Sequence, residues 1–260
     1  MDLELRGKTA LVTGASKGIG RAVADVLAAE GCNLVLAARN PENLERAANE
    51  IRARHQITTR TIPVDLARSE GQRRLAELCH DADILINNAG SNPGGEIDDI
   101  SEETWRAAWD LKVFAYINLT RYFYAAMKAR RKGVIVNVIG NAGEQMNSRY
   151  ILGSSGNIAL MGLTRALGAR ATDFGIRVVG VNPGLTATER ALTMLRAWSQ
   201  NKYGTPDRWQ EFLGQLNLPF GRMGEPEEVA NAIAFLASPK ASYISGTILT
   251  VDGGATNRQP

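Results

Sequence analysis

The sequence predicts an α/β protein built on a doubly wound parallel sheet. Short apolar runs of the length of buried strands alternate along the chain with segments whose apolar residues recur at helical spacing. The first run, residues 9–12, leads through a glycine-rich turn into a helix whose Val23, Val26 and Leu27 share one face. No Pro/Gly/Ser-rich linker, charge block or repeat divides the 260 residues, so we expect a single domain covering residues 1–260.

Composition restricts the function. Hydrophobic residues make up 44% of the chain, which is sufficient for a large core, and the net charge of +3 is spread over interspersed acids and bases. That pattern gives no footprint for nucleic acid or for a membrane surface. Cys32 and Cys79 lack the spacing of metal ligands and suit a reducing compartment, and no apolar run is long enough to span a bilayer. We therefore expect a cytoplasmic protein without a metal site.

The strongest single signal is a glycine-rich turn at residues 13–20, Thr-Gly-Ala-Ser-Lys-Gly-Ile-Gly. Gly14 permits a tight turn, Gly18 lets backbone N–H groups approach a pyrophosphate, and Gly20 lets the helix pack close to the strand. Phosphate groups can then bind at the helix N-terminus. The motif predicts a dinucleotide site; the alternative is an ordinary strand-to-helix turn.

The end of the second predicted strand, residues 33–37, selects the form of the dinucleotide. NAD-preferring sites place a carboxylate just beyond this strand to accept the ribose 2′-OH, whereas this chain has Ala38 followed by Arg39. Arg39 and Lys17 would supply two cations to a 2′-phosphate, with Ser16 as a hydroxyl donor. We therefore expect NADP(H) rather than NAD(H); the alternative is that both cations are solvated surface charges.

Further strands and helices follow in alternation. Asn40 is the predicted cap of a helix over 41–54, and Ser101 that of a long helix running to about residue 131. Ser154 and Ser155 are expected to cap a later helix, with Gly153 in the turn before it. The remaining strands are expected at 58–64, from 83 onward, and at 133–139, 175–181 and 245–254, with a helix over 69–80.

These motifs resemble those of the classical short-chain dehydrogenase/reductase family. Besides the glycine turn, the shared elements are Asn-Asn-Ala-Gly at 87–90, Gly-Leu-Thr-Arg-Ala-Leu at 162–167 and Asn-Pro-Gly at 182–184, so the likeness covers nearly the whole chain. The resemblance implies a Rossmann-type sheet of seven strands in the order 3-2-1-4-5-6-7 with helices on both faces, a nicotinamide cofactor, a small-molecule substrate and commonly a homotetramer. It also implies a set of further cofactor contacts, which are Ile19, Asp65, Leu66, Asn88, Ala89, Gly90, Pro183, Gly184, Thr186 and Thr188. For Asp65, a helix cap is the alternative.

The catalytic positions depart from the family's pattern. Alignment on the shared motifs places substituted residues where the family has an asparagine, a serine, a tyrosine and a lysine: Asp110, Gly140, Gly153 and Asn157. In the family the lysine holds the nicotinamide ribose and activates the tyrosine, which exchanges the proton that accompanies hydride transfer. Asn157 can still hydrogen-bond a ribose hydroxyl, but it brings no charge.

Tyr150 and Asp110 are the candidate replacements. Tyr150 lies seven positions before Asn157, a spacing that resembles half of the tyrosine–lysine motif of the enoyl-ACP-reductase branch. It is either a proton donor or a pocket wall, and as an unassisted phenol it would support ketone reduction better than alcohol oxidation. Asp110 would act as a base if it were buried; otherwise it pairs with a neighbour such as Asn141 or Lys112.

Residues 189–220 depart from the simple alternation and are expected to form a helical substrate lid. Apolar residues such as Leu192, Trp198 and Phe212 favour an apolar or aromatic substrate, although an ordinary helical cap explains them equally well. The predicted function is an NADP(H)-dependent oxidoreductase acting on a carbonyl or an alcohol. The alternatives are a lyase, isomerase or dehydratase on the same fold, and a catalytically inactive NADP(H)-binding partner subunit.

Overall fold

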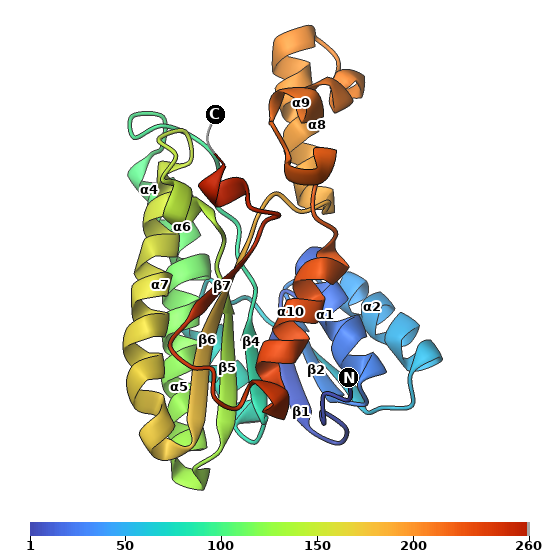
Figure 1. The fold of residues 1–260 in the computed structure, drawn as a ribbon, viewed down its shortest axis with the longest axis vertical. Helices are drawn as coiled ribbons and strands as arrows, with labels where there is room; N and C mark the ends of the chain where they lie inside the picture. The colour runs from blue at the N-terminus through green and yellow to red at the C-terminus, as the bar shows by residue number, and fades with distance from the viewer. Residues whose placement is uncertain (259–260) are drawn as a thin grey trace.

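A seven-stranded sheet forms the centre of the computed structural model, which describes residues 1–258 (Figure 1). Neighbouring strands all run parallel, in the order β3-β2-β1-β4-β5-β6-β7, and this confirms the predicted topology. The strands are β1 Thr9–Thr13, β2 Asn33–Ala38, β3 Thr59–Pro63, β4 Ile84–Asn87, β5 Gly133–Val138, β6 Ile176–Pro183 and β7 Ile248–Val251.

Helices cover both faces of the sheet and bury a core on each. Because side chains alternate along a strand, Ala10 and Val12 of β1 join a core with α1 and α10, whereas Leu11 joins the opposite core with α3 and α5. None of the helices in the described part of the chain has the length and apolar character of a membrane span. The helices are α1 Gly18–Ala29, α2 Pro41–Arg54, α3 Ser69–Cys79, α4 Glu102–Trp109, α5 Ala115–Arg130, α6 Ala142–Gln145, α7 Ile151–Ala171, α8 Glu189–Tyr203, α9 Gln210–Gln215 and α10 Pro226–Ala237.

The long helix predicted after Ser101 is interrupted. The Ser101 hydroxyl does cap its start, accepting the Thr104 backbone N–H at 3.2 Å, and its last turn ends at Arg131. Between α4 and α5, however, Asp110–Phe114 form a π-helical segment. A π turn is wider than an α turn. Residues in and after this segment therefore lie on different sides of the helix from those that regular helical spacing predicts.

Helix α7 begins earlier than predicted. Its first helical residue is Ile151 and Tyr150 takes the N-cap position, so residues 153–155 lie within the first turns of the helix. The Ser155 hydroxyl donates back to the Ile151 carbonyl at 2.9 Å, as serine hydroxyls inside helices commonly do. The predicted cap at Ser154 and Ser155 is therefore wrong.

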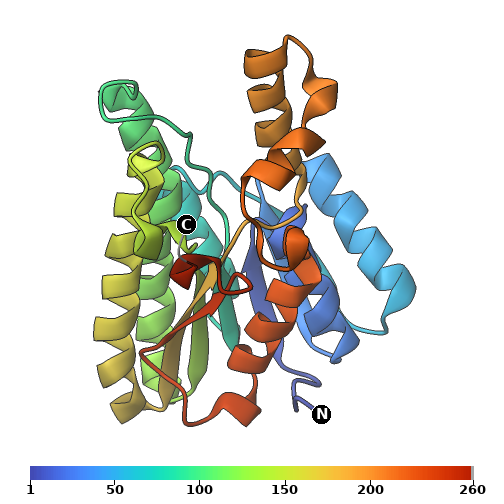
Figure 2. The same cartoon turned by 45° about the horizontal axis from the view of Figure 1, so that its top comes forward.

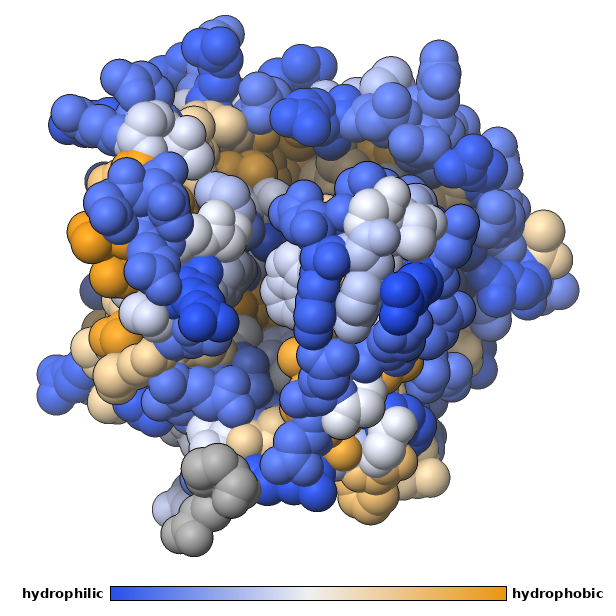
Figure 3. All heavy atoms as spheres, turned by 90° about the horizontal axis from the view of Figure 1, so that it is seen from above, coloured by the Kyte–Doolittle hydropathy of each residue, from blue (hydrophilic) through white to orange (hydrophobic). Residues whose placement is uncertain are grey.

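Residues 189–220 form a helical unit beyond the carboxyl ends of the strands (Figures 1 and 2). Its apolar side chains cover one another: Leu195 is completely buried, and the Trp198 and Phe212 rings lie with their centroids 6.0 Å apart. Most of the apolar content of residues 189–220 is thus accounted for without an apolar substrate, although Phe220 is 85% exposed. Figure 3, a view onto the same end of the molecule, shows largely hydrophilic residues on the surface.

Candidate active site

The glycine-rich turn joins β1 to α1 with very little space around it. Gly14 and Gly18 have φ angles of +67° and +58°, in the left-handed region that favours glycine. A Cβ atom on Gly20 would lie 2.4 Å from both the Gly14 carbonyl oxygen and Asn88 Nδ2. Helix α1 begins at Gly18, so its free N–H groups open at the carboxyl end of β1. The three glycines therefore have the geometry of a phosphate-binding turn.

Asn88 and Ala89 fasten this turn to the end of β4. Asn88 Nδ2 donates to the Thr13 carbonyl at 2.9 Å, while the backbone N–H groups of Asn88 and Ala89 donate to Thr13 Oγ1 at 2.9 and 3.0 Å. The Asn88 side chain is thereby committed to the turn itself. Two of the predicted cofactor contacts, Asn88 and Ala89, are thus brought next to Gly14, and their described contacts stabilise the turn.

The expected 2′-phosphate end of the groove carries Ser16, Lys17 and Arg39. Lys17 forms an ion pair with Glu189 at 2.8 Å, between two side chains that are mostly exposed. Its hydrogen bond to Glu189 holds the pKa of that carboxyl below its ordinary value. Arg39 follows β2 and is exposed. Both predicted cations therefore lie at the carboxyl edge of the sheet, although Lys17 is already paired.

Asp65 and Leu66 follow β3 and have structural contacts. Asp65 Oδ1 accepts the Ala67 backbone N–H at 3.0 Å within a turn, and α3 begins only at Ser69 with Arg68 at its N-cap, so Asp65 does not cap that helix. Leu66 is buried in the core, and its carbonyl accepts a hydrogen bond from Gln72 Nε2 at 2.7 Å. The structure thus gives each of them a role that does not depend on an adenine ring.

The segment after β6 leads from the sheet to the lid. The Gly184 N–H donates to the Val251 carbonyl at 3.0 Å, which holds the residue following Pro183 beside the end of β7. Thr186 is buried and its hydroxyl donates to the Gly184 carbonyl at 3.0 Å, while the Thr188 hydroxyl caps α8. A Cβ atom on Gly18 would lie 3.3 Å from Thr188 Cγ2, so this segment passes directly beside Ile19 and the glycine turn.

Gly140 and Asn157 lie against each other. Asn157 Nδ2 donates to the Gly140 carbonyl at 3.2 Å, and a Cβ atom on Gly140 would lie only 2.9 Å from the same Nδ2. Gly140 has a φ of +131°, so a side chain here would be both crowded and strained. Asn157 is almost fully buried, yet its Oδ1 has no hydrogen-bond partner among the described residues. A buried acceptor without a donor is costly, so Asn157 Oδ1 is an unsatisfied polar atom beside the predicted catalytic positions.

The ring of Tyr150 lies over Gly153. A Cβ atom on Gly153 would be 2.0 Å from Tyr150 Cε1 and 2.4 Å from Cζ. The phenol ring therefore occupies the space into which a side chain at position 153 would project. The backbone N–H of Tyr150 donates a hydrogen bond to the Asn147 carbonyl at 3.0 Å, which fixes the backbone at this position.

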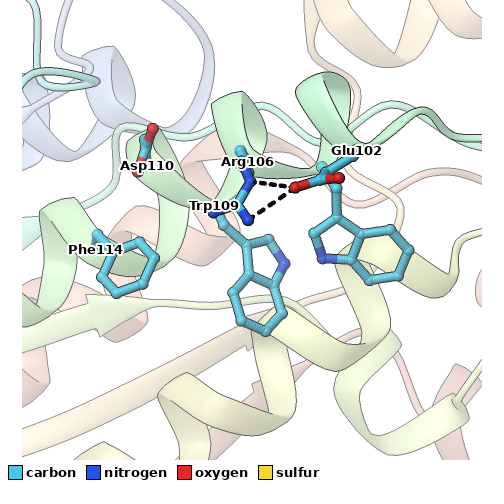
Figure 4. A pocket seen from close by; sticks show the side chains of 6 residues that line it. Glu102, Arg106, Trp109, Asp110 and Phe114 are labelled. Atoms are coloured by element: carbon cyan, nitrogen blue, oxygen red, sulfur yellow. Dashed lines mark hydrogen bonds and ion pairs between the residues drawn. The ribbon is translucent and has the colours of Figure 1, made fainter.

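Asp110 does not join this group. It is exposed and lines a shallow surface hollow beside the two tryptophans of α4 (Figure 4). The lining consists of Glu102, Trp105, Arg106, Trp109, Asp110 and Phe114. No hydrogen bond or ion pair joins Asp110 to Asn141 or Lys112 within residues 1–258. Alignment with the family's motif placed Asp110 at the position of the family's asparagine, but in the structure its side chain lies on the exposed side of the π-helical segment.

Lys112, two residues further on, is the side chain that points inward. It is 7% exposed, and its Nζ donates to the Val138 carbonyl at 2.7 Å and to the Tyr116 hydroxyl at 2.9 Å. A Cβ atom on Gly90 would lie 2.5 Å from Lys112 Cδ. Burial lowers the pKa of Lys112 to about 7, and the positive charge of Arg190 adds to that effect. The sequence signal that could have predicted this buried amine is a lysine at an inward-facing helical position. Lys112 is named from the sequence only as a partner for Asp110.

Comparison with known proteins places this site in a family. The family model for short chain dehydrogenases matches residues 8–198, and the chain belongs to that family. It is 36% identical over 257 residues to galactitol 2-dehydrogenase (L-tagatose-forming) from Cereibacter sphaeroides, covering 97% of this chain and 96% of that protein. It is also 30% identical over 253 residues to the NADPH-dependent reductase BacG of Bacillus subtilis, covering 95% and 97% of the two chains.

A solved structure extends the likeness to the whole fold. The crystal structure of L-sorbose reductase from Gluconobacter frateurii, complexed with NADPH and L-sorbose, superimposes with a TM-score of 0.93 at 32% identity and covers 100% of both chains. The expected Rossmann-type fold and the expected membership of an oxidoreductase family are therefore confirmed.

Proposed function

We propose that the protein is an NADP(H)-dependent oxidoreductase that interconverts a carbonyl and an alcohol on a small polar molecule, with Tyr150 in the role of the usual tyrosine. The observation that carries this proposal is the Tyr150 ring, which fills the space over Gly153. Two relatives named for galactitol, L-tagatose and L-sorbose favour a polyhydroxylated substrate.

The residues of the groove fit a dinucleotide with a 2′-phosphate. The crowded glycine turn leaves the N–H groups of α1 as donors to the pyrophosphate, and the carboxylate that would select NAD is replaced by Ala38. Arg39 and Lys17 would hold the 2′-phosphate. The Asn157 amide would hydrogen-bond a ribose hydroxyl without supplying a charge. The nicotinamide ring of such a cofactor supplies or accepts a hydride.

The chain's own residues then handle the proton. In the reductive direction the Tyr150 hydroxyl gives its proton to the carbonyl oxygen of the substrate, and the half-buried tyrosine regains a proton from water. In the oxidative direction the same oxygen must receive the alcohol proton. Gly140 has no hydroxyl that could hydrogen-bond the substrate carbonyl. Other polar groups that contact the substrate would therefore have to orient that carbonyl. The reductive direction is favoured, because Asn157 supplies no charge to stabilise a phenolate.

Replacing Tyr150 with phenylalanine tests this assignment. We expect turnover with NADPH to fall by roughly 10²- to 10⁴-fold, the usual contribution of a positioned acid or base, with little change in the Kd for NADPH. Tyr122→Phe, on the exposed side of α5, is the matched control and should retain full turnover. Unchanged turnover in Tyr150→Phe would remove Tyr150 from the mechanism.

A second candidate is a cofactor-binding partner subunit without turnover, and glycines at positions 140 and 153 favour it. Its signature is tight NADPH binding with no conversion of polyols, ketoses or other carbonyl compounds. A lyase, isomerase or dehydratase would instead convert substrate with no change in nicotinamide absorbance. We also propose that the protein is a homotetramer. Sedimentation analysis of the purified protein would measure its oligomeric state.

A further inference from the structure

Lys112 is a buried amine without a negative partner. Buried lysines are normally paired with a carboxylate, but no carboxylate lies within ion-pair distance of its Nζ in the part of the chain that the structure describes. The groups facing it are the Tyr116 hydroxyl on α5, the Val138 carbonyl on β5 and Gly90 after β4. The charged side chain that acts on it is Arg190 on α8, which is also positive and lowers its pKa.

The hydrogen bonds around Nζ match a neutral amine. Lys112 Nζ has two acceptors, the Val138 carbonyl oxygen and the Tyr116 hydroxyl oxygen, and Tyr116 uses its own proton to reach the same carbonyl at 2.9 Å. A neutral amine has two N–H groups, so these two bonds satisfy it. An ammonium group would have a third N–H, for which residues 1–258 provide no oxygen or nitrogen acceptor; the other group facing Nζ is the Tyr116 ring, whose centroid lies 4.5 Å away.

The position of this amine connects it with the dinucleotide groove. Its stem packs on Gly90, the last residue of the second cofactor motif, and its Nζ is fixed to Val138, two residues before Gly140. On the other side of Gly140 lies Asn157, which cannot carry a charge. Arg190 reaches the same region by donating to the Asn92 carbonyl at 2.6 Å. Lys112 is therefore the buried basic group between the ends of β4 and β5.

We propose that Lys112 is unprotonated in the free protein and takes up a proton from water when NADP(H) binds, so that cofactor binding creates the cation that Asn157 does not supply. The inference rests on the proposed function. The negative charges of the cofactor stabilise an ammonium in a region of low dielectric, and a cofactor hydroxyl or a bound water completes its third hydrogen bond. Lys112 is a positioning residue in this scheme, and the reaction is the simple addition of one proton to one amine.

Calorimetry of NADPH binding in buffers of different ionisation enthalpy measures this proton. A group with a pKa of about 7 is roughly 10% protonated at pH 8 and roughly 90% at pH 6, so uptake should approach 0.9 proton per NADPH at pH 8 and nearly vanish at pH 6. A 2′-phosphate is already ionised at pH 8 and contributes no proton there. Lys112→Met should abolish the uptake, whereas Lys128→Met, an exposed lysine on α5, should leave it unchanged.

A surface variant covers the case in which Lys112→Met does not fold. Arg190→Gln removes the positive charge near Lys112, so a larger fraction of Lys112 should already be protonated in the free protein. Proton uptake on NADPH binding at pH 8 should therefore decrease. Equal binding enthalpies in all buffers for the wild type, or uptake that persists in Lys112→Met, would overturn the inference while NADPH binding stands. Absence of NADPH binding in the wild type would overturn the proposed function and this inference together.

Discussion

Replacing Lys112 with methionine should remove most of the pH dependence of folding near neutral pH. Lysine and methionine have similar lengths, and Tyr116 still bonds the Val138 carbonyl in the variant. In the wild type, burial depresses the pKa of Lys112 from its ordinary value of 10.5 to about 7. Between pH 7 and pH 9 the unfolded chain therefore binds more protons at this residue than the folded chain does, so raising the pH favours the folded state.

The magnitude follows from that difference in proton binding. Each pH unit over which the two states differ by one proton changes the free energy of unfolding by about 1.4 kcal/mol, so the wild type should gain about 2 kcal/mol between pH 7 and pH 9 from Lys112. The window ends at pH 9 because burial raises the pKa of Cys32 to about 12 and holds the pKa of Tyr116 well above its ordinary value. At higher pH, unfolding would release protons from these two groups.

Urea unfolding of both proteins at pH 7, 8 and 9, without cofactor, measures this difference. We expect the stability advantage of Lys112→Met over the wild type to shrink by about 2 kcal/mol as the pH rises through this range. Parallel pH dependences of the two proteins would refute the reasoning, because they would show that Lys112 keeps its proton when folded.

Three further predictions concern the cofactor groove. Gly20→Ala should destabilise the protein by roughly 2 kcal/mol or more in urea unfolding, since its Cβ atom would meet backbone at 2.4 Å, whereas Gly162→Ala, in open space on α7, should stabilise it by about 1 kcal/mol. Arg39→Ala should erase a preference for NADPH over NADH of about tenfold or more in calorimetry; an unchanged ratio would remove Arg39 from the site. Glu189→Gln should release Lys17 and tighten NADPH binding without affecting NADH, an effect that should weaken at high salt.

The fold and the dinucleotide turn could be predicted because their signals are local. Gly14, Gly18 and Gly20 stand between a strand and a helix, and each has the crowding or backbone angle that the spacing indicates. The capping residue Asn40 likewise accepts the Asn43 N–H at 2.7 Å, and α2 has the predicted bounds. The sequence pattern of such features lies within a few neighbouring residues, although Asn88 and Ala89 of a distant segment add to the crowding at Gly14 and Gly20.

The catalytic side of the site depends on features that spacing cannot convey. Within the π-helical segment Lys112 is buried and Asp110 is exposed, and the alignment on the family's motifs, which singled out Asp110, did not foresee this arrangement. The placement of Tyr150 over Gly153 depends on where α7 begins, which was predicted a few residues too late. Both errors come from helix irregularity at the carboxyl end of the sheet.

The base of the lid rests on the groove that would hold the cofactor. Thr188 lies beside Gly18, Glu189 pairs with Lys17, and Arg190 bonds the Asn92 carbonyl across the groove. Helix α8 cannot pivot at its base without disturbing these three contacts. If the proposed cofactor binds here, its binding and any movement of α8 should be coupled, and we expect an ordered reaction in which the cofactor enters first and leaves last, which product-inhibition patterns test.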